Sequence, residues 1–178
     1  MTPDLLRLRK AVEDLEDIVD ALALELVDDP DWAEPSDASY LTKADRANPD
    51  IVANVSARAV TNKLIAWFGK DAEGYVGLWR GPKQRPVETA PVVRLDSGGQ
   101  YEIVAATIPD YLAISVPEDE LDAARAALTE AGFTVAASRE EIWRKVETID
   151  DDPNEVRNTL YEAALKAASQ RPAPRGAS

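Results

Sequence analysis

Carboxylates are the main side chains of this 178-residue sequence that could do acid–base chemistry, because it has 33 Asp and Glu residues and neither His nor Cys. A glycosidase needs only two carboxyl groups at a suitable separation, one of them with a raised pKa. Without His and Cys, a Ser-His-Asp triad, a cysteine nucleophile, disulfides and a zinc site with imidazole or thiolate ligands are excluded. Most of the acids follow patterns typical of solvated helix faces. We therefore expect no catalytic residues and no enzyme activity.

Two stretches resemble ligand-binding loops, but both lack required residues. Residues 69–74 (Gly-Lys-Asp-Ala-Glu-Gly) lack the spacing and the hydroxyl residue of a phosphate-binding loop. Residues 150–161 begin like a calcium loop, yet Glu155 stands where such a loop needs Gly, and Tyr161 where it needs Glu. Residues 152–155 are better explained as the start of a helix. We expect no metal, nucleotide or other cofactor.

The formal charge of −13 is unevenly distributed, since residues 1–40 hold 12 acids against three bases. This imbalance disfavours direct binding to nucleic acid or to an anionic membrane, and it would steer a basic protein toward the acidic surface. Acidity can also serve solubility alone, and that alternative stays open. We expect a partner to contact loop, strand and turn acids and an aromatic anchor in the first loop: Asp28, Asp29, Asp31, Trp32, Asp71, Glu73, Asp96 and Glu102.

The N-terminal apolar residues recur in alternating steps of three and four: Leu5, Leu8, Val12, Leu15, Val19, Leu22 and Leu26. With Thr2 as N-cap and Pro3 in the first turn, this pattern predicts one long helix that ends at residues 28–30 (Asp-Asp-Pro). Its heptad seam could form a coiled-coil dimer. Additional apolar residues such as Ile18 and Leu24 widen the stripe, which favours packing onto the chain's own domain and hence a monomer.

The next segments predict a long connector followed by a second helix. Residues 30–48 resemble a loop, and connections of this length are often functional, so the loop is a candidate contact surface. Helix chemistry restarts at Asn48 and Pro49, and an apolar face continues up to Gly69.

Residues 74–106 form the only clear strand region, because Val, Ile, Tyr and Trp cluster there. Alternation along Gly74–Arg80 places Tyr75, Gly77 and Trp79 on one face. Trp79 could be an exposed stacking residue, but a place in the core or at its rim is favoured, and Gly77 leaves a gap that allows another element to approach closely. Residues 97–99 (Ser-Gly-Gly) predict a tight hairpin between Pro91–Asp96 and Gln100–Ala106. We expect the face of this hairpin that carries Arg94, Asp96, Gln100 and Glu102 to meet solvent.

The C-terminal third predicts three helices, over Glu118–Ala131, after the N-cap Ser138 and after Asp152. The predicted fold is α+β, with a mainly antiparallel sheet flanked by helices, a long N-terminal helix and a helical C-terminal third. We expect a single domain over residues 1–170 and a flexible tail over 171–178. No secretory signal or membrane-length apolar run is evident, so a cytoplasmic location is expected.

Residues 66–81 (Ala-Trp-Phe-Gly-Lys-Asp-Ala-Glu-Gly-Tyr-Val-Gly-Leu-Trp-Arg-Gly) and 90–101 (Ala-Pro-Val-Val-Arg-Leu-Asp-Ser-Gly-Gly-Gln-Tyr) resemble the SUKH superfamily. The matching features are the Gly-rich approach to a strand ending in Trp-Arg, the Pro-Val-Val strand opening and the Asp-Ser-Gly-Gly turn. Gly98 stands where the family often has an acidic residue. The superfamily includes bacterial immunity proteins against polymorphic toxins and fungal regulators of cell-wall assembly. The resemblance covers roughly residues 60–115, and it implies an α+β fold and a non-enzymatic role in binding other proteins.

Two functional hypotheses follow from the residues and the resemblance. The first is an immunity protein of a toxin–antitoxin type of system, which occludes a basic toxin domain, commonly a nuclease in this family. The second is a regulatory or scaffold protein that binds a cellular partner through its helices.

Overall fold

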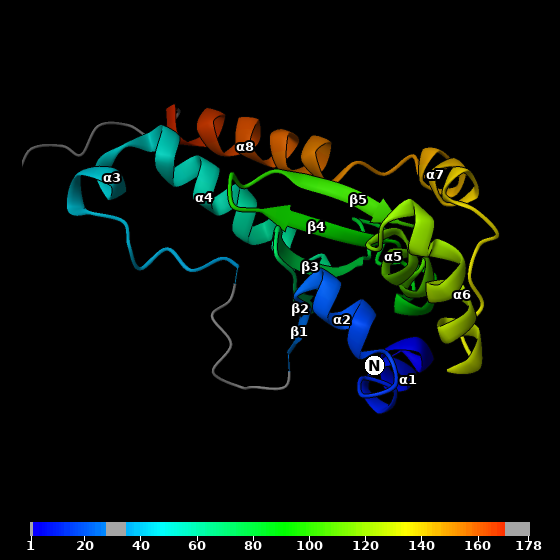
Figure 1. Cartoon of the computed structure of the whole chain (residues 1–178). Coiled ribbons are helices and arrows are strands. Elements are labelled where there is room, and N and C mark those ends of the chain that lie inside the picture. Colours follow the sequence, from blue (N-terminus) through cyan, green and yellow to red (C-terminus); the bar gives the residue numbers. More distant parts are fainter. Residues whose placement is uncertain (1, 28–34, 170–178) are drawn as a thin grey trace, which may run out of the picture. The chain divides into compact units, whose positions relative to one another are not determined.

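The computed structural model describes residues 2–27 and 35–169, which belong to two compact units (Figure 1). The first unit comprises residues 1–32 and 64–153, and the second comprises residues 33–63 and 154–178. Within the described ranges, no helix has the length and apolar character required to cross a membrane.

The first unit contains an antiparallel sheet whose strands follow one another in chain order. The strands are β1 (Glu25–Leu26), β2 (Ile65–Lys70), β3 (Gly74–Trp79), β4 (Val92–Asp96) and β5 (Tyr101–Ala105). The predicted strand β3 and the predicted β4–β5 hairpin are confirmed, with Gly99 at a φ of 81° in the turn. The α+β class and the antiparallel sheet are therefore as the sequence predicts.

The helix that was expected to reach Gly69 ends earlier. Helix α4 covers Pro49–Asn62, and Ile65 and Phe68 belong to β2. No Gly or Pro separates the helix from the strand, so the sequence carries no strong stop signal there. Neighbouring aromatic residues, which favour strands, indicate the change only weakly, since short apolar runs fit both structures.

The prediction of a single long N-terminal helix is also wrong. The chain forms α1 (Pro3–Lys10) and α2 (Glu16–Leu22), joined by a turn. The side chains of Leu8 and Leu15 on either side of this break are nonetheless buried in the core of their own unit. The heptad pattern therefore predicts which side chains are buried, but it does not predict whether the helix is continuous, because that depends on tertiary packing.

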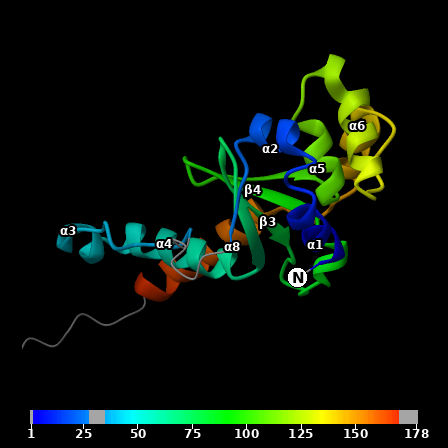
Figure 2. The same cartoon turned by 60° about the horizontal axis from the view of Figure 1, so that its bottom comes forward.

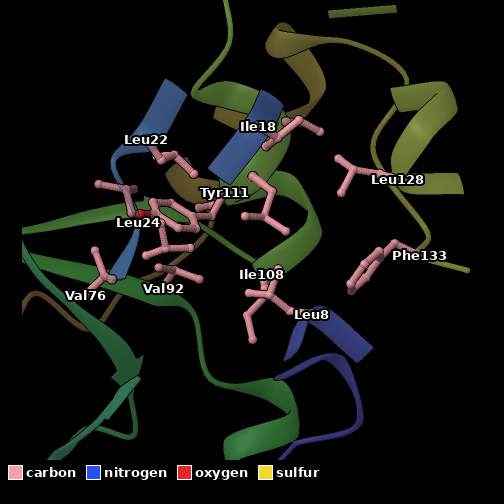
Figure 3. Close-up of a cluster of buried hydrophobic side chains, with 14 of the residues drawn as sticks. Leu8, Ile18, Leu22, Leu24, Val76, Val92, Ile108, Tyr111, Leu128 and Phe133 are labelled. Atoms are coloured by element: carbon pink, nitrogen blue, oxygen red, sulfur yellow. The ribbon is translucent and has the colours of Figure 1, made fainter. Parts of the chain in front are cut away.

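One face of the sheet carries the main core, and α1, α2 and α5 (Ile108–Ile114) lie on that side (Figure 2). Figure 3 shows core side chains from these helices and from β3 and β4, with Leu22 and Val92 near Tyr111 and with Leu8 beside Ile108. Helix α5 is not among the predicted elements, because a proline such as Pro109 usually limits regular structure. Pro109 lies in the first helical turn, where its missing N–H costs no hydrogen bond, and Thr107 caps the helix.

The helices after α5 are close to the predicted ones. They are a 3-10 turn η2 (Glu118–Glu120), α6 (Leu121–Glu130) and α7 (Arg139–Glu147), and Gly132 ends α6 with a φ of 85°. The buried carboxylate of Asp110 on α5 accepts hydrogen bonds from Lys145 Nζ (3.0 Å) and from the Ala136 backbone N–H (2.8 Å). These bonds fix α7 and the segment before it relative to α5.

The second unit contains α3 (Lys43–Ala47), α4 and most of α8 (Pro153–Ser169). Helix α3 falls inside the expected loop, and a capping box between Thr42 and Asp45 starts it. The Tyr161 hydroxyl on α8 donates a hydrogen bond to Asp50 on α4. The expected tail over residues 171–178 lies outside the described residues.

Both expectations for strand β3 are confirmed. Trp79 is fully buried, and its indole N–H donates to the Asp151 carbonyl over 3.0 Å. A Cβ atom at Gly77 would lie 2.4 Å from Ile65 Cγ2 and 3.0 Å from the Trp67 Cα atom, which shows how closely β2 approaches. The prediction that the Arg94 side of the hairpin faces solvent is wrong at Arg94, whose side chain is only 15% exposed. Arg94 pairs with Val76 in the sheet register, and the two share the face of the sheet on which Val76 is fully buried.

Candidate functional site

A pocket of about 300 Å³ opens in the first unit on the side of the sheet that carries the core. The turn between β2 and β3, strands β4 and β5, and helices α2, α5 and α7 all contribute to its walls. Its polar and aromatic lining includes Asp71, Glu73, Arg94, Glu102, Tyr111, Arg139 and Trp143. This pocket collects more ionisable side chains than the pocket lined by Asp4 and Glu88 or the one lined by Asp122, Arg125 and Glu130.

Asp71 links three parts of the pocket wall. Its Oδ1 accepts the backbone N–H groups of Glu73 and Gly74, both over 2.9 Å, which holds the tight turn between β2 and β3. Its Oδ2 accepts a hydrogen bond from Arg94 Nε on β4 and another from the Tyr111 hydroxyl on α5, each over 2.9 Å. The carboxylate is almost fully buried, and these donors compensate for the water that it loses.

The surroundings of Tyr111 favour its neutral form. Burial raises the pKa of the Tyr111 hydroxyl strongly, and the negative charge of Asp71 beside it raises this pKa further. A phenol in this position donates a hydrogen bond and does not act as a base near neutral pH. Tyr111 therefore orients the Asp71 carboxylate from the helix side.

Arg94 is shared by three carboxylates. Its Nη2 lies 2.8 Å from Asp71 Oδ2, its Nη1 forms an ion pair with Glu73, and Glu102 Oε2 is 3.8 Å from the same Nη1. Burial acts to lower the pKa of Arg94, but the hydrogen bond and the charges of Asp71 and Glu73 outweigh it, so the pKa is raised. The guanidinium is thus held permanently charged and is largely occupied by the chain's own acids.

Helix α7 supplies the remaining polar wall. Arg139 donates to the carbonyl of Ile114 over 2.9 Å and to the carbonyl of Val116, and its Nε pairs with Glu118. These contacts fasten α7 to the end of α5. Trp143, one turn further along α7, lines the pocket while 46% of its surface stays exposed.

The structure brings together some of the predicted contact residues and separates others. Asp71, Glu73 and Glu102 line the same pocket. Asp96 is not among the pocket residues; its Oδ1 accepts the Gln100 backbone N–H over 2.8 Å and holds the hairpin turn. The other four predicted residues, Asp28, Asp29, Asp31 and Trp32, lie outside the described residues.

Sequence reasoning missed Arg94, Tyr111, Arg139 and Trp143. The position of Trp143 could have been found, because Ile142 and Val146 form an apolar stripe that leaves it on the outer side of its helix. No local pattern indicates that Tyr111 and Asp71 meet.

The arrangement is suited to binding more than to acid–base chemistry. Asp71, the most buried carboxylate of the pocket, is engaged by hydrogen-bond donors from the turn, β4 and α5. Glu73 and Glu102 keep 67% and 62% of their side-chain surfaces exposed and can face a ligand. No protein-family model, curated protein or solved structure matches the chain. The SUKH resemblance accordingly stays a prediction from the sequence.

Proposed function

We propose that this chain is a non-enzymatic protein that binds a basic protein partner and, as the SUKH resemblance implies, an immunity-type inhibitor that occludes a toxin domain. The observation that carries the proposal is the pocket of the first unit, where exposed carboxylates and an exposed tryptophan lie together. That the partner is a toxin is inferred from the resemblance alone. That the partner is basic is inferred from the acidic residues of the chain.

The surface beside the pocket is acidic. Helix α2 contributes Ala21 and Leu22 to the pocket wall, and the chain around it exposes Glu13, Asp14, Glu16, Asp17 and Asp20. No Lys or Arg occurs between residues 11 and 42. Such a one-signed surface speeds the approach of a basic protein and repels nucleic acid, which supports a protein partner.

The exposed tryptophan supports protein contact more specifically. Tryptophan is enriched among the few interface residues that carry most of the binding energy, and such residues occupy positions where the partner excludes water. Trp143 adjoins a pocket, so a partner could cover the ring and the pocket together. Solubility alone would require the charges but not an exposed indole.

A second candidate function rests on the second unit. Val52 and Val60 on α4 are 44% and 41% exposed, and Tyr40 is 63% exposed. These side chains are consistent with a regulatory or scaffold protein that binds a cellular partner through its helices. Binding through these apolar side chains would depend little on salt, unlike binding at the acidic pocket.

The deciding experiment starts from the reading frames next to the gene. A neighbouring frame that ends in a toxin domain would be expressed with and without this chain, followed by growth measurements and purification of the complex. We expect restored growth, a stoichiometric complex and loss of toxin activity in vitro. A complex that leaves the toxin active would favour the scaffold function, and failure of the chain to bind the toxin would remove the immunity proposal.

A further inference from the structure

We propose that the pocket between β5, α5 and α7 receives a single arginine side chain of the bound protein. This inference rests on the proposed function and specifies the contact that the partner makes. The guanidinium would lie between the carboxylates of Glu73 and Glu102 and the indole of Trp143, all of which line the pocket.

The size of the pocket fits one side chain. Its volume of about 300 Å³ is at the lower end of the range of about 300–1,000 Å³ that is typical of small-molecule sites. A long unbranched side chain can enter a space of this size from a neighbouring protein surface.

The charge of the pocket selects a cation. Among the described residues of the lining, Asp71, Glu73 and Glu102 share one basic group, Arg94. The other arginine of the lining, Arg139, is paired with Glu118, which lies outside it. An excess of negative charge therefore remains on the lining.

An anionic ligand would compete with the chain's own groups for the two arginines of the lining. The nitrogens of Arg94 contact Asp71 and Glu73, and those of Arg139 contact two backbone carbonyls and Glu118. Binding an anion would require breaking these contacts. Glu102, by contrast, lies 3.8 Å from Arg94, beyond hydrogen-bonding distance, so an incoming donor can bind it without displacing a hydrogen bond to Arg94.

Arginine fits the pocket better than lysine because of Trp143. A guanidinium is planar, stacks on an aromatic face and can donate two hydrogen bonds to a carboxylate at the same time. The chain already uses this type of contact, since the Arg7 guanidinium lies 5.3 Å from the centre of the Phe133 ring. A lysine ammonium would keep the charge but lose the planar stacking.

The test uses the full chain labelled with ¹⁵N and small probes in place of a partner. The chain has four tryptophans, so four indole N–H signals are expected, and Trp143→Phe identifies the one from Trp143. The probe is the peptide acetyl-Gly-Arg-Gly-amide, and the matched probe contains citrulline, which has a similar shape without the charge. Free L-arginine and the corresponding lysine peptide complete the series.

We expect the arginine peptide to shift the Trp143 indole signal in a saturable way, with an affinity in the millimolar range that is typical of a single side chain. Glu102→Gln should weaken this binding about fivefold or more, because a charge-assisted hydrogen bond is lost. Glu130→Gln removes the same charge from an exposed position at the end of α6 and should leave the affinity unchanged within about twofold. The lysine peptide and free arginine, whose carboxylate would meet the pocket acids, should both bind more weakly.

Equal shifts with the citrulline peptide would overturn the inference, as would an arginine response that Glu102→Gln leaves intact. Tighter binding of free arginine than of the peptide would overturn it in favour of a small-molecule site. The toxin experiment is independent of these probes. If Glu102→Gln and Trp143→Phe bind and inhibit the toxin as the unmodified chain does, the pocket inference fails while the proposed function stands.

Discussion

The carboxylate of Asp71 accepts a hydrogen bond from the hydroxyl of Tyr111 over 2.9 Å, although the two residues are 40 positions apart in the chain. This contact connects the turn between β2 and β3 to α5. The same oxygen of Asp71 also accepts a hydrogen bond from Arg94 on β4. The pocket wall therefore depends on one buried carboxylate that three separate segments share.

Replacing Asp71 should destabilise the fold much more than replacing its exposed neighbour Glu73. Asp71→Asn leaves the mostly buried Arg94 without its most buried counter-charge, and we expect a loss of about 2–4 kcal/mol in the free energy of unfolding. Glu73→Gln removes the same charge from a side chain that is 67% exposed and should cost at most about 1 kcal/mol. Urea unfolding followed by circular dichroism measures both. Similar losses for the two variants would show that Asp71 has no special structural role.

Alkaline pH should weaken the fold through Tyr111. Its pKa in the folded chain is raised by burial and by Asp71, whereas an unfolded tyrosine has a pKa of about 10. The stabilisation that this group contributes is complete below about pH 10 and is lost as the pH rises toward the folded pKa, because only the unfolded chain releases the proton. We expect Tyr111 to account for a loss of about 1 kcal/mol at pH 11.

The control for the pH prediction is Tyr111→Phe. This variant should be less stable than the unmodified chain at pH 8 by about 1 kcal/mol, since a hydrogen bond is lost, but its stability should fall less between pH 9.5 and 11. Urea midpoints at three pH values give the comparison. Parallel decreases in the two proteins would exclude Tyr111 as the group responsible.

Glycine at position 77 should be required for the pairing of β2 with β3. Gly77→Ala places a Cβ atom 2.4 Å from Ile65 Cγ2, so the side chain and the strand must shift, at a cost of about 1–3 kcal/mol. Gly98→Ala is the matched control, because the nearest atom to its Cβ, at 3.2 Å, is the end of the Asp96 side chain, and its cost should be below about 1 kcal/mol. Thermal unfolding distinguishes the variants, and an equal tolerance of both substitutions would contradict the close approach.

The oligomeric state should be that of a monomer, with a light-scattering mass close to 19.4 kDa. Leu15 is only 2% exposed and belongs to the chain's own core, so Leu15→Glu should abolish the fold instead of separating a dimer. Leu6, on the same N-terminal stretch, is 46% exposed, and Leu6→Glu should leave both fold and mass unchanged. A doubled mass that Leu6→Glu returns to the monomer value would support association through α1.

Association with the basic partner should be sensitive to salt. Charge steering acts mainly on the association rate, and the screening length is about 8 Å at physiological ionic strength. Changing Asp28, Asp29 and Asp31 to Asn should therefore slow association at low salt more than it speeds dissociation. The matched control changes the exposed acids Glu88, Asp119 and Glu130 to their amides. An association rate that ignores both salt and the first set of changes would leave the negative charge as a solubility trait.

The sequence predicts those elements whose signals are local. The Ser-Gly-Gly turn of residues 97–99 and the caps at Ser138 and Gly132 correspond to a hairpin and to helix ends that the structure contains. The break between α1 and α2 has no such signal, because it contains neither Gly nor Pro and the leucines on both sides face one core. Strand β2 was missed for a similar reason, since its apolar run continues that of α4 without a break.

The candidate site was predicted only in part. Abundant acids made Asp71, Glu73 and Glu102 candidates as surface charges, and two of them are indeed exposed. The burial of Asp71 follows from contacts with Arg94 and Tyr111, and these depend on the strand register and on helix α5, which was not predicted. Tertiary pairing of this kind cannot be inferred from spacing along the chain.

The short strand β1 affects how the sheet behaves toward other chains at high concentration. It covers part of the outer edge of β2 with only Glu25 and Leu26, and Glu25 is exposed. The register shift between Trp67 and Gly69 also interrupts the regular pairing of β2. Edge-to-edge aggregation requires a long, flat and uncharged strand edge, and a two-residue strand with a carboxylate beside a bulge offers little of it. On this side the sheet is thus protected against growing by addition of strands from neighbouring molecules.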